Sequence, residues 1–141
     1  MMIYFAGSIR GGREDQALYL EIVKKLSAYG TVATEHVSDQ KLSSYGETQL
    51  SDNDIYSRDV AWLTGSDIVV AEVTTTSLGV GFEIGLADNL RKKILCLYRE
   101  QEGKKLSAMI AGNPRVTVKT YKELGDLDEI FAEFFKLTAV V

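Results

Sequence analysis

Residues 67–73 have the sequence DIVVAEV, and this stretch decides the fold class. Its middle is almost unbroken in apolar residues, which predicts a strand buried on both faces at the centre of a parallel sheet. On either side of it, short apolar runs rich in β-branched residues alternate with longer segments of helical period. This alternation is typical of βαβ units, so we predict an α/β protein.

Working outward from this stretch, we predict five strands, at residues 2–6, 31–34, 67–73, 93–98 and 115–121. Helices are expected from the loop at residues 7–13 to Gly30, from Ser51 through Trp62, and over residues 81–90, 106–111 and 122–137. Ser51 and Asp54 resemble a capping box with Asp in place of Glu. Five strands with four crossovers predict a flavodoxin- or Rossmann-like three-layer sandwich with strand order 2-1-3-4-5.

The bulk composition limits the possible functions. The 141 residues are 45% hydrophobic and 26% charged, which predicts one domain spanning residues 1–141. The formal net charge of -4 gives no global attraction to nucleic acid or to an anionic membrane. Cys96 lies in the apolar run ILCLY, which predicts a buried, inert thiol and a reducing compartment. No apolar run approaches the roughly 18 residues of a membrane span, and we expect a soluble cytoplasmic protein.

The ligand is expected at the switch point between strands one and three. Two glycine-rich loops leave the carboxyl ends of these strands, GSIRGGR at residues 7–13 and TTTSLGVG at residues 74–81. Both loops are therefore predicted to border one crevice. The first offers glycines, a hydroxyl and two guanidinium groups at a helix start, which favours an anion. It is not a P-loop, because Arg13 and Glu14 stand where Lys and Ser or Thr are needed. A tight turn with solvated arginines is the alternative.

Two carboxylates are candidates for chemistry. Glu83 is expected within the first turn of a helix, where it is either a structural partner of the helix dipole or a functional group. Asp59 shares a helix face with Ile55 and Trp62, and is either solvated or in the crevice. A pair of carboxylates at a switch point suits glycosidic chemistry, in which one attacks the anomeric carbon and the other assists proton transfer. The glycines near Glu83 miss the dinucleotide fingerprint by one position, since Ile84 stands where the third glycine belongs.

The segment after strand two carries the chain's lone histidine. His36 lies near the same edge of the sheet, and a ligand contact and a simple loop residue are both open interpretations. Residues 35–50 are polar and without a period, so a flexible loop that covers the site is expected. With one histidine and one cysteine, we expect no dedicated zinc site.

Five segments, YFAGSIRGGREDQ, GTVATEHV, RDVAWLTGSD, VVAEVTTTSLGVGFEIGLA and KLSAMIAG, run in order from Tyr4 to Gly112. Together they resemble the 2′-deoxynucleoside 5′-phosphate N-hydrolase family of the nucleoside 2-deoxyribosyltransferase group. The resemblance implies a flavodoxin-like homodimer that hydrolyses deoxynucleoside monophosphates to free base and 2-deoxyribose 5-phosphate. It implies neither a metal nor an organic cofactor.

The resemblance also implies a role for individual residues. Glu83 is the nucleophile that forms a glycosyl-enzyme intermediate, Asp59 serves the sugar and proton transfer, and Tyr4 orients the nucleophile. The implied substrate-binding residues are Gly7, Ser8, Ile9, Arg10, Gly11, Gly12, Arg13, His36, Ser77, Gly79, Ser107, Ala108 and Met109. Residues 107–109 are expected to contribute to the site of the neighbouring subunit, with Ser107 reaching its phosphate. The sequence departs from the family at TTTS, where a proline-containing turn is more usual, and at Phe82, where Tyr is common; these departures concern base preference.

Two other functions stay open. A nucleoside 2-deoxyribosyltransferase shares the carboxylate but acts on nucleosides and passes the sugar to a second base. A non-catalytic nucleotide sensor would bind phosphate with the same loops while Glu83 only caps a helix. Arg10 and the serines favour a monophosphate, and Asp59 and Tyr4 together with Glu83 favour an enzyme.

Overall fold

The computed structural model describes residues 1–10, 12–36 and 50–139. Within them, one parallel sheet is formed by β1 (Met2–Ala6), β2 (Thr31–Ala33), β3 (Ile68–Glu72), β4 (Lys93–Tyr98) and β5 (Val116–Thr120). The strand order is β2-β1-β3-β4-β5, which confirms the prediction. As expected of a central strand, β3 is buried along its whole length, and it pairs with β1 on one side and β4 on the other.

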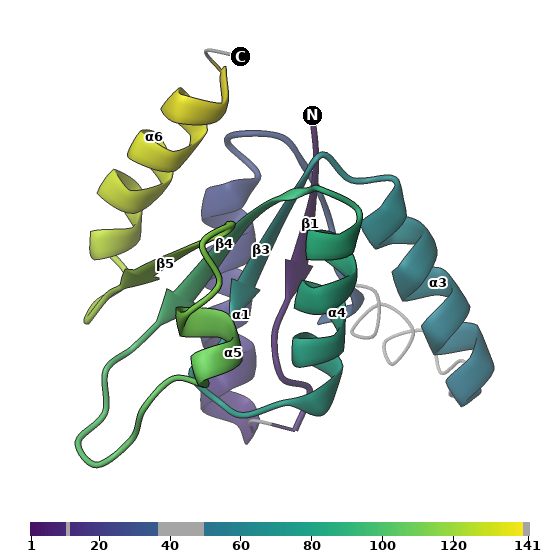
Figure 1. Cartoon of the computed structure of the whole chain (residues 1–141), viewed down its shortest axis with the longest axis horizontal. Coiled ribbons are helices and arrows are strands. Elements are labelled where there is room, and N and C mark those ends of the chain that lie inside the picture. The colour runs from purple at the N-terminus through teal and green to yellow at the C-terminus, as the bar shows by residue number, and fades with distance from the viewer. Residues whose placement is uncertain (11, 37–49, 140–141) are drawn as a thin grey trace.

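Helices cover both faces of the sheet, which gives the predicted three layers (Figure 1). One face packs against α1 (Gly12–Leu26) and α6 (Asp126–Ala139), and the other against α3 (Asp52–Thr64), α4 (Leu78–Asn89) and α5 (Ala108–Ala111). Because successive side chains of a strand point to opposite faces, Ile3 and Phe5 join the first core while Tyr4 and Ala6 join the second. The Tyr4 side chain is therefore directed to the layer of α3 and α4.

The helix that carries Glu83 begins earlier than the sequence suggested. Ser77 caps α4 by accepting a hydrogen bond from the Val80 backbone N–H at 3.2 Å, so the helix starts at Leu78. The predicted start at Gly81, with Glu83 in the first turn, was wrong. Glu83 lies in the second turn, where the helix dipole acts weakly, since its effect falls off beyond the first turn.

Other helix boundaries also differ from the prediction, and α1 ends at Leu26 instead of at Gly30. The last helix begins at Asp126 instead of residue 122, because the Asp126 carboxylate accepts hydrogen bonds from the backbone N–H groups of Lys122 and Glu123 and closes a turn there. The short helix begins at Ala108, after Ser107 as its N-cap. The Ser51 cap is confirmed, since its hydroxyl accepts a hydrogen bond from the Asp54 backbone N–H at 3.1 Å.

A polar network fixes the turn that leads from β3 into α4. The fully buried Glu72 accepts a hydrogen bond from the Thr74 backbone N–H at 2.7 Å and another from the Tyr121 hydroxyl. The Thr75 hydroxyl donates to Asp15 of α1 at 2.7 Å. The turn before α4 is thus hydrogen-bonded to α1 through Thr75, and its preceding strand to Tyr121 through Glu72.

The remaining predictions concern Cys96, membrane-spanning helices and the loop that was expected to cover the site. Cys96 is free and buried, as predicted. No helix within the described ranges is long and apolar enough to cross a membrane. The predicted covering loop lies almost entirely in residues 37–49, and these residues, like Gly11, are outside the described part of the chain.

Candidate active site

Tyr4, Asp59 and Glu83 come together from three elements, β1, α3 and α4. Asp59 and Glu83 line the wall of a cavity of about 300 Å³ between α3 and α4. Tyr4 lies beneath them, 1% exposed, and its hydroxyl hydrogen-bonds to the Glu83 carboxylate. The full lining is Ile9, Glu35, Asp52, Ile55, Tyr56, Asp59, Val60, Leu63, Gly79, Phe82, Glu83 and Leu86. The cavity is therefore mostly apolar, with its carboxylates gathered on one side.

Glu83 has the perturbed acidity expected of a functional carboxylate. Burial raises its pKa from the ordinary 4.5 to about 7; the Tyr4 hydrogen bond acts against this shift, and the negative charge of Asp59 adds to it. Its Oε2 atom is buried and accepts no hydrogen bond from any described residue. Glu83 thus has one carboxylate oxygen without a hydrogen-bond donor among the described residues, while Tyr4 holds the group in place.

Tyr4 serves as a donor and not as an acid. Burial and the neighbouring Glu83 charge raise the pKa of its hydroxyl well above the ordinary value of 10.0. The phenol therefore keeps its proton at neutral pH and donates a hydrogen bond to the Glu83 carboxylate. Tyr4 is consequently suited to orienting Glu83, the role that the resemblance implies.

Asp59 is held by an ion-pair network at the edge of the cavity. The Arg58 Nε lies 3.0 Å from Asp59 Oδ1, and its Nη2 lies 3.4 Å from Glu35 Oε2. The guanidinium also lies 4.8 Å from the centre of the Trp62 ring. The side chains of Arg58, Glu35 and Asp59 are 17%, 10% and 12% exposed, so this is a largely buried network.

Of the described residues in the loop after β1, Ile9 is the one that lines the cavity. Ser8 is buried, and both Arg10 and Arg13 are exposed. Gly12 opens α1 with a φ of 87°, a left-handed conformation that favours glycine. The two arginines are exposed to solvent and do not line the cavity.

His36 lies on the other face of the sheet. Its ring packs against Phe5 and Tyr19, with ring centroids 6.0 and 4.8 Å away, and its Nε2 lies 2.9 Å from the Gly7 carbonyl oxygen. A Cβ on Gly7 would lie 3.0 Å from the Tyr19 ring, so glycine is needed for this close packing. His36 thus anchors the start of the loop, and its predicted contact with the base stays a prediction.

A second, larger cavity lies on the far side of the first turn of α4. This groove, of about 820 Å³, runs between α4 and α5 and is lined by Ser77, Ser107 and Met109 among others. Ser107 caps α5, and Ala108 next to it is exposed. The structure therefore places Gly79 and Ile9 at the cavity of Glu83, and Ser77, Ser107 and Met109 at the groove.

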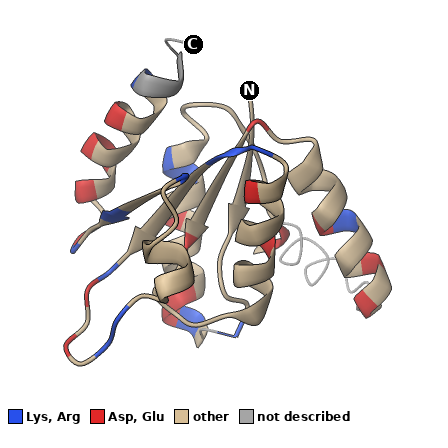
Figure 2. Ribbon diagram, in the orientation of Figure 1, with Lys and Arg blue, Asp and Glu red and all other residues tan. Residues whose placement is uncertain are grey.

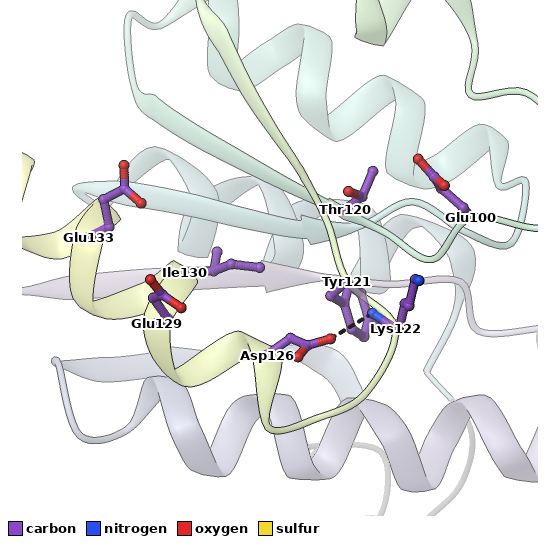
Figure 3. Close-up of a pocket in the computed structure, with 8 residues that line it drawn as sticks. All are labelled: Glu100, Thr120, Tyr121, Lys122, Asp126, Glu129, Ile130 and Glu133. Carbon is purple, nitrogen blue, oxygen red and sulfur yellow. Dashed lines mark hydrogen bonds between the residues drawn. The ribbon is translucent and has the colours of Figure 1, made fainter.

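Figure 3 shows a third cavity, of about 370 Å³, between β5 and α6. Its lining is Glu100, Thr120, Tyr121, Lys122, Asp126, Glu129, Ile130 and Glu133. The carboxylates outnumber the single lysine, so this cavity would repel a phosphate group. Among the described residues no group of histidine, cysteine or carboxylate side chains is arranged to hold a metal ion.

Two residues of the site escaped the sequence analysis. Glu35 lines the cavity and is 8% exposed, and its position directly after β2 was a usable signal, because carboxyl ends of parallel strands meet at one edge. Arg58 gave no signal, since neighbours in sequence do not face each other on a helix. Only its long side chain, held by Trp62 and Glu35, brings its charge to Asp59.

Comparison with known proteins gives a consistent assignment. Residues 3–118 match the family described as nucleoside 2-deoxyribosyltransferase. The 5-hydroxymethyl-dUMP N-hydrolase of Danio rerio is 54% identical over 139 residues, covering 96% of each chain. The protein of the same name from Homo sapiens is 48% identical over 138 residues, covering 95% of this chain and 79% of the relative.

Two solved structures share the fold. The CMP N-glycosidase BcmB of Clostridium botulinum superposes with a TM-score of 0.66 at 16% identity, covering 94% of this chain and 99% of the other. A 2-deoxyribosyltransferase from Bacillus psychrosaccharolyticus gives a TM-score of 0.68 at 15% identity, covering 91% and 90%. At these identities the likeness concerns the fold alone.

Proposed function

The chain belongs to the nucleoside 2-deoxyribosyltransferase family, and from this premise we propose that it hydrolyses the N-glycosidic bond of 2′-deoxynucleoside 5′-monophosphates. The products are the free base and 2-deoxyribose 5-phosphate. The observation that carries the mechanism is the partly buried Glu83 carboxylate, held by Tyr4 beside Asp59 on the wall of a cavity. The names of the relatives make 5-hydroxymethyl-dUMP the first substrate to test.

The reaction proceeds in two displacements. A Glu83 oxygen bonds to the anomeric carbon as the bond to the base nitrogen breaks, and the base leaves with the bonding electrons and takes up a proton. Asp59, on the same side of the cavity, serves the sugar and the proton transfers. Water then attacks the glycosyl ester: its oxygen bonds to the anomeric carbon, its proton passes to Asp59, and Glu83 is released as a carboxylate. Tyr4 keeps Glu83 aligned through both steps.

The direct test is release of 5-hydroxymethyluracil from 5-hydroxymethyl-dUMP, followed by chromatography. Other deoxy monophosphates and the matching ribonucleotides complete the panel and establish the base and sugar preference. Turnover of at least one deoxy monophosphate is the expected result. Tight binding of these nucleotides without release of any base would contradict the proposal and favour a nucleotide sensor.

The rate of base release will depend on the ionisation of Glu83. Only the carboxylate form attacks, and its pKa is raised to about 7, so kcat/KM is expected to fall about tenfold per pH unit below that value. Initial rates between pH 5 and 9 with subsaturating substrate measure this fall, which is the acid limb of the pH profile of kcat/KM. A rate that stays constant down to pH 5 would show that Glu83 does not act as an ionised nucleophile.

We further propose that the groove between α4 and α5 receives a second copy of this chain. Leu78 and Met109, which line it, are 95% and 85% exposed, and such apolar exposure is typical of an interface. Figure 2 shows that α4 and α5 carry few charged residues, whereas α6 is rich in acidic ones. In this dimer Ser107 of one subunit approaches the phosphate bound by the other.

A complementation experiment tests this arrangement. Ser107→Asp keeps an N-cap for α5 but places a negative charge against the phosphate, so kcat/KM should fall roughly 100-fold. Ser107→Asn caps without charge and should stay within a few-fold of the wild type. Mixed dimers of Ser107→Asp and Glu83→Gln subunits retain one intact site, so the mixture should recover about a quarter of wild-type activity. Absence of recovery, with dimers present, would place Ser107 outside the partner's site.

A cytoplasmic location is also part of the proposal. The support is the single cysteine of the chain, Cys96, which is buried and free and whose thiol pKa is raised by burial to about 12. Such a thiol is inert and is compatible with a reducing compartment. Fractionation of cells that express the tagged chain measures the location.

A further inference from the structure

The Arg58 side chain bonds to its neighbour in sequence, which is unusual within a helix. It forms an ion pair with Asp59, the next residue of α3, although consecutive residues of a helix point in different directions. The contact exists because Trp62, one turn on, supports the guanidinium from below and Glu35 fixes its other end. This arrangement costs side-chain freedom, and it brings a cation to the edge of the Glu83 cavity.

The described titratable and charged groups at or beside the Glu83 cavity come from β1, from the residues after β2 and from α3. Tyr4 lies on β1, Glu35 follows β2, and Asp52, Arg58 and Asp59 belong to α3. Arg58 is ion-paired with both Glu35 and Asp59, so the guanidinium lies between two of the carboxylates that line the cavity. The charge of Asp59 already acts on Glu83. Because Arg58 is bonded to Asp59, we expect a change in the Arg58 charge to act on Glu83 together with the Asp59 charge.

We propose that Arg58 is a positioning residue, which fixes the Asp59 carboxylate beside Glu83 and limits the negative charge that Glu83 experiences. Through Nε it binds Asp59 Oδ1 and leaves the other carboxylate oxygen for the sugar. Through its charge it prevents the carboxylates at the cavity from suppressing the ionisation of Glu83. This inference rests on the proposed function, because it assigns Arg58 a role in the same reaction.

This role of Arg58 predicts that two substitutions shift the pKa of Glu83 in opposite directions. Arg58→Gln removes the cation and should raise this pKa by about one unit. The fall of kcat/KM at acid pH then begins at higher pH, and the rate at pH 7 should decrease about fivefold. Glu35→Gln removes a negative charge and should move the limb to lower pH. Arg58→Lys keeps the charge and should leave the limb in place, although it loses the planar contact with Asp59 and part of kcat.

The control variant is Lys25→Gln, which removes the same charge from an ion pair between α1 and α6, where Lys25 Nζ lies 2.6 Å from Asp128 Oδ1. It should leave both the rate and the limb unchanged. A purely structural role for Arg58 would lower the melting temperature and the active fraction without moving the limb. Should Arg58→Gln fail to fold, Arg58→Lys and Glu35→Gln still test the proposal.

Direct titration of Glu83 separates this inference from the proposed function. The Glu83 carboxyl carbon is followed by ¹³C NMR in the wild type, in Arg58→Gln and in Glu35→Gln, without substrate. Opposite shifts of its midpoint support the role of Arg58 whether or not base is released. Unchanged midpoints in both variants overturn it, even when the wild type hydrolyses deoxy monophosphates. Failure of the wild type to release any base contradicts only the proposed function.

Discussion

Replacing Glu83 with Gln is expected to reduce base release by at least about 1,000-fold, because the amide lacks the charge and nucleophilicity needed to displace the base. The side chain keeps its size and its contact with Tyr4, so binding of the substrate should change little. Single-turnover measurements with 5-hydroxymethyl-dUMP give the rate of the chemical step. Glu129→Gln, a change of an exposed carboxylate on α6, is the matched control and should retain full activity. Full activity of Glu83→Gln would remove Glu83 from the mechanism.

The same variant should be more stable than the wild type above neutral pH. The folded state raises the pKa of Glu83 from 4.5 to about 7, so it favours the protonated carboxyl. Stability from this group is fully present below pH 4.5 and is lost as the pH rises through 7. Gln stays neutral throughout, and we expect a gain of about 1–2 kcal/mol at pH 8, allowing for partial exposure, and none at pH 4. Urea unfolding at the two pH values measures it, and equal stability at pH 8 would mean that the charge is well solvated.

Removing the 5′-phosphate from the substrate should reduce kcat/KM about 1,000-fold. In the proposed function the loop arginines bind the phosphate, and they lose their partner when a deoxynucleoside replaces the monophosphate. Arg10→Ala should lower the rate with the monophosphate roughly 100-fold and leave the rate with the deoxynucleoside nearly unchanged. The deoxynucleoside is the internal control for folding of this variant. Equal kcat/KM values for the two substrates would contradict the assignment.

This comparison also separates hydrolysis from sugar transfer. A nucleoside 2-deoxyribosyltransferase uses the same type of carboxylate but acts on deoxynucleosides in the presence of a second base. We expect free 2-deoxyribose 5-phosphate to accumulate at the same rate with and without added base. Formation of a new nucleoside from added base would instead support the transferase alternative.

The fold was predictable because its signals are local and repeated. The buried stretch of β3, the alternation around it and the two glycine-rich loops are sufficient to give the strand order. Helix starts were less predictable, since a cap is decided by a single side chain. Ser77 begins α4 before Gly81, and Asp126 delays α6 by closing a turn.

The site was predictable where topology brings strand ends together and not where a side chain reaches across. Topology places Tyr4 and the α4 start at one edge of the sheet, so the proximity of Glu83 to Tyr4 follows from it. The pKa of Glu83 depends instead on burial, which needs coordinates. The contact of Arg58 with Asp59 depends on a rotamer supported by Trp62, and no pattern in the sequence encodes it.

The helix that carries Glu83 has one further property. Gly81 and Gly85 line the groove, and a Cβ built on either would meet no described atom within 4 Å. Each glycine weakens a helix interior by about 1 kcal/mol relative to alanine, a cost that association with the proposed second copy would offset. In the proposed dimer, folding and pairing would be thermodynamically linked, so dilution would lower the stability of the fold. The concentration of the chain would then set the fraction of folded enzyme.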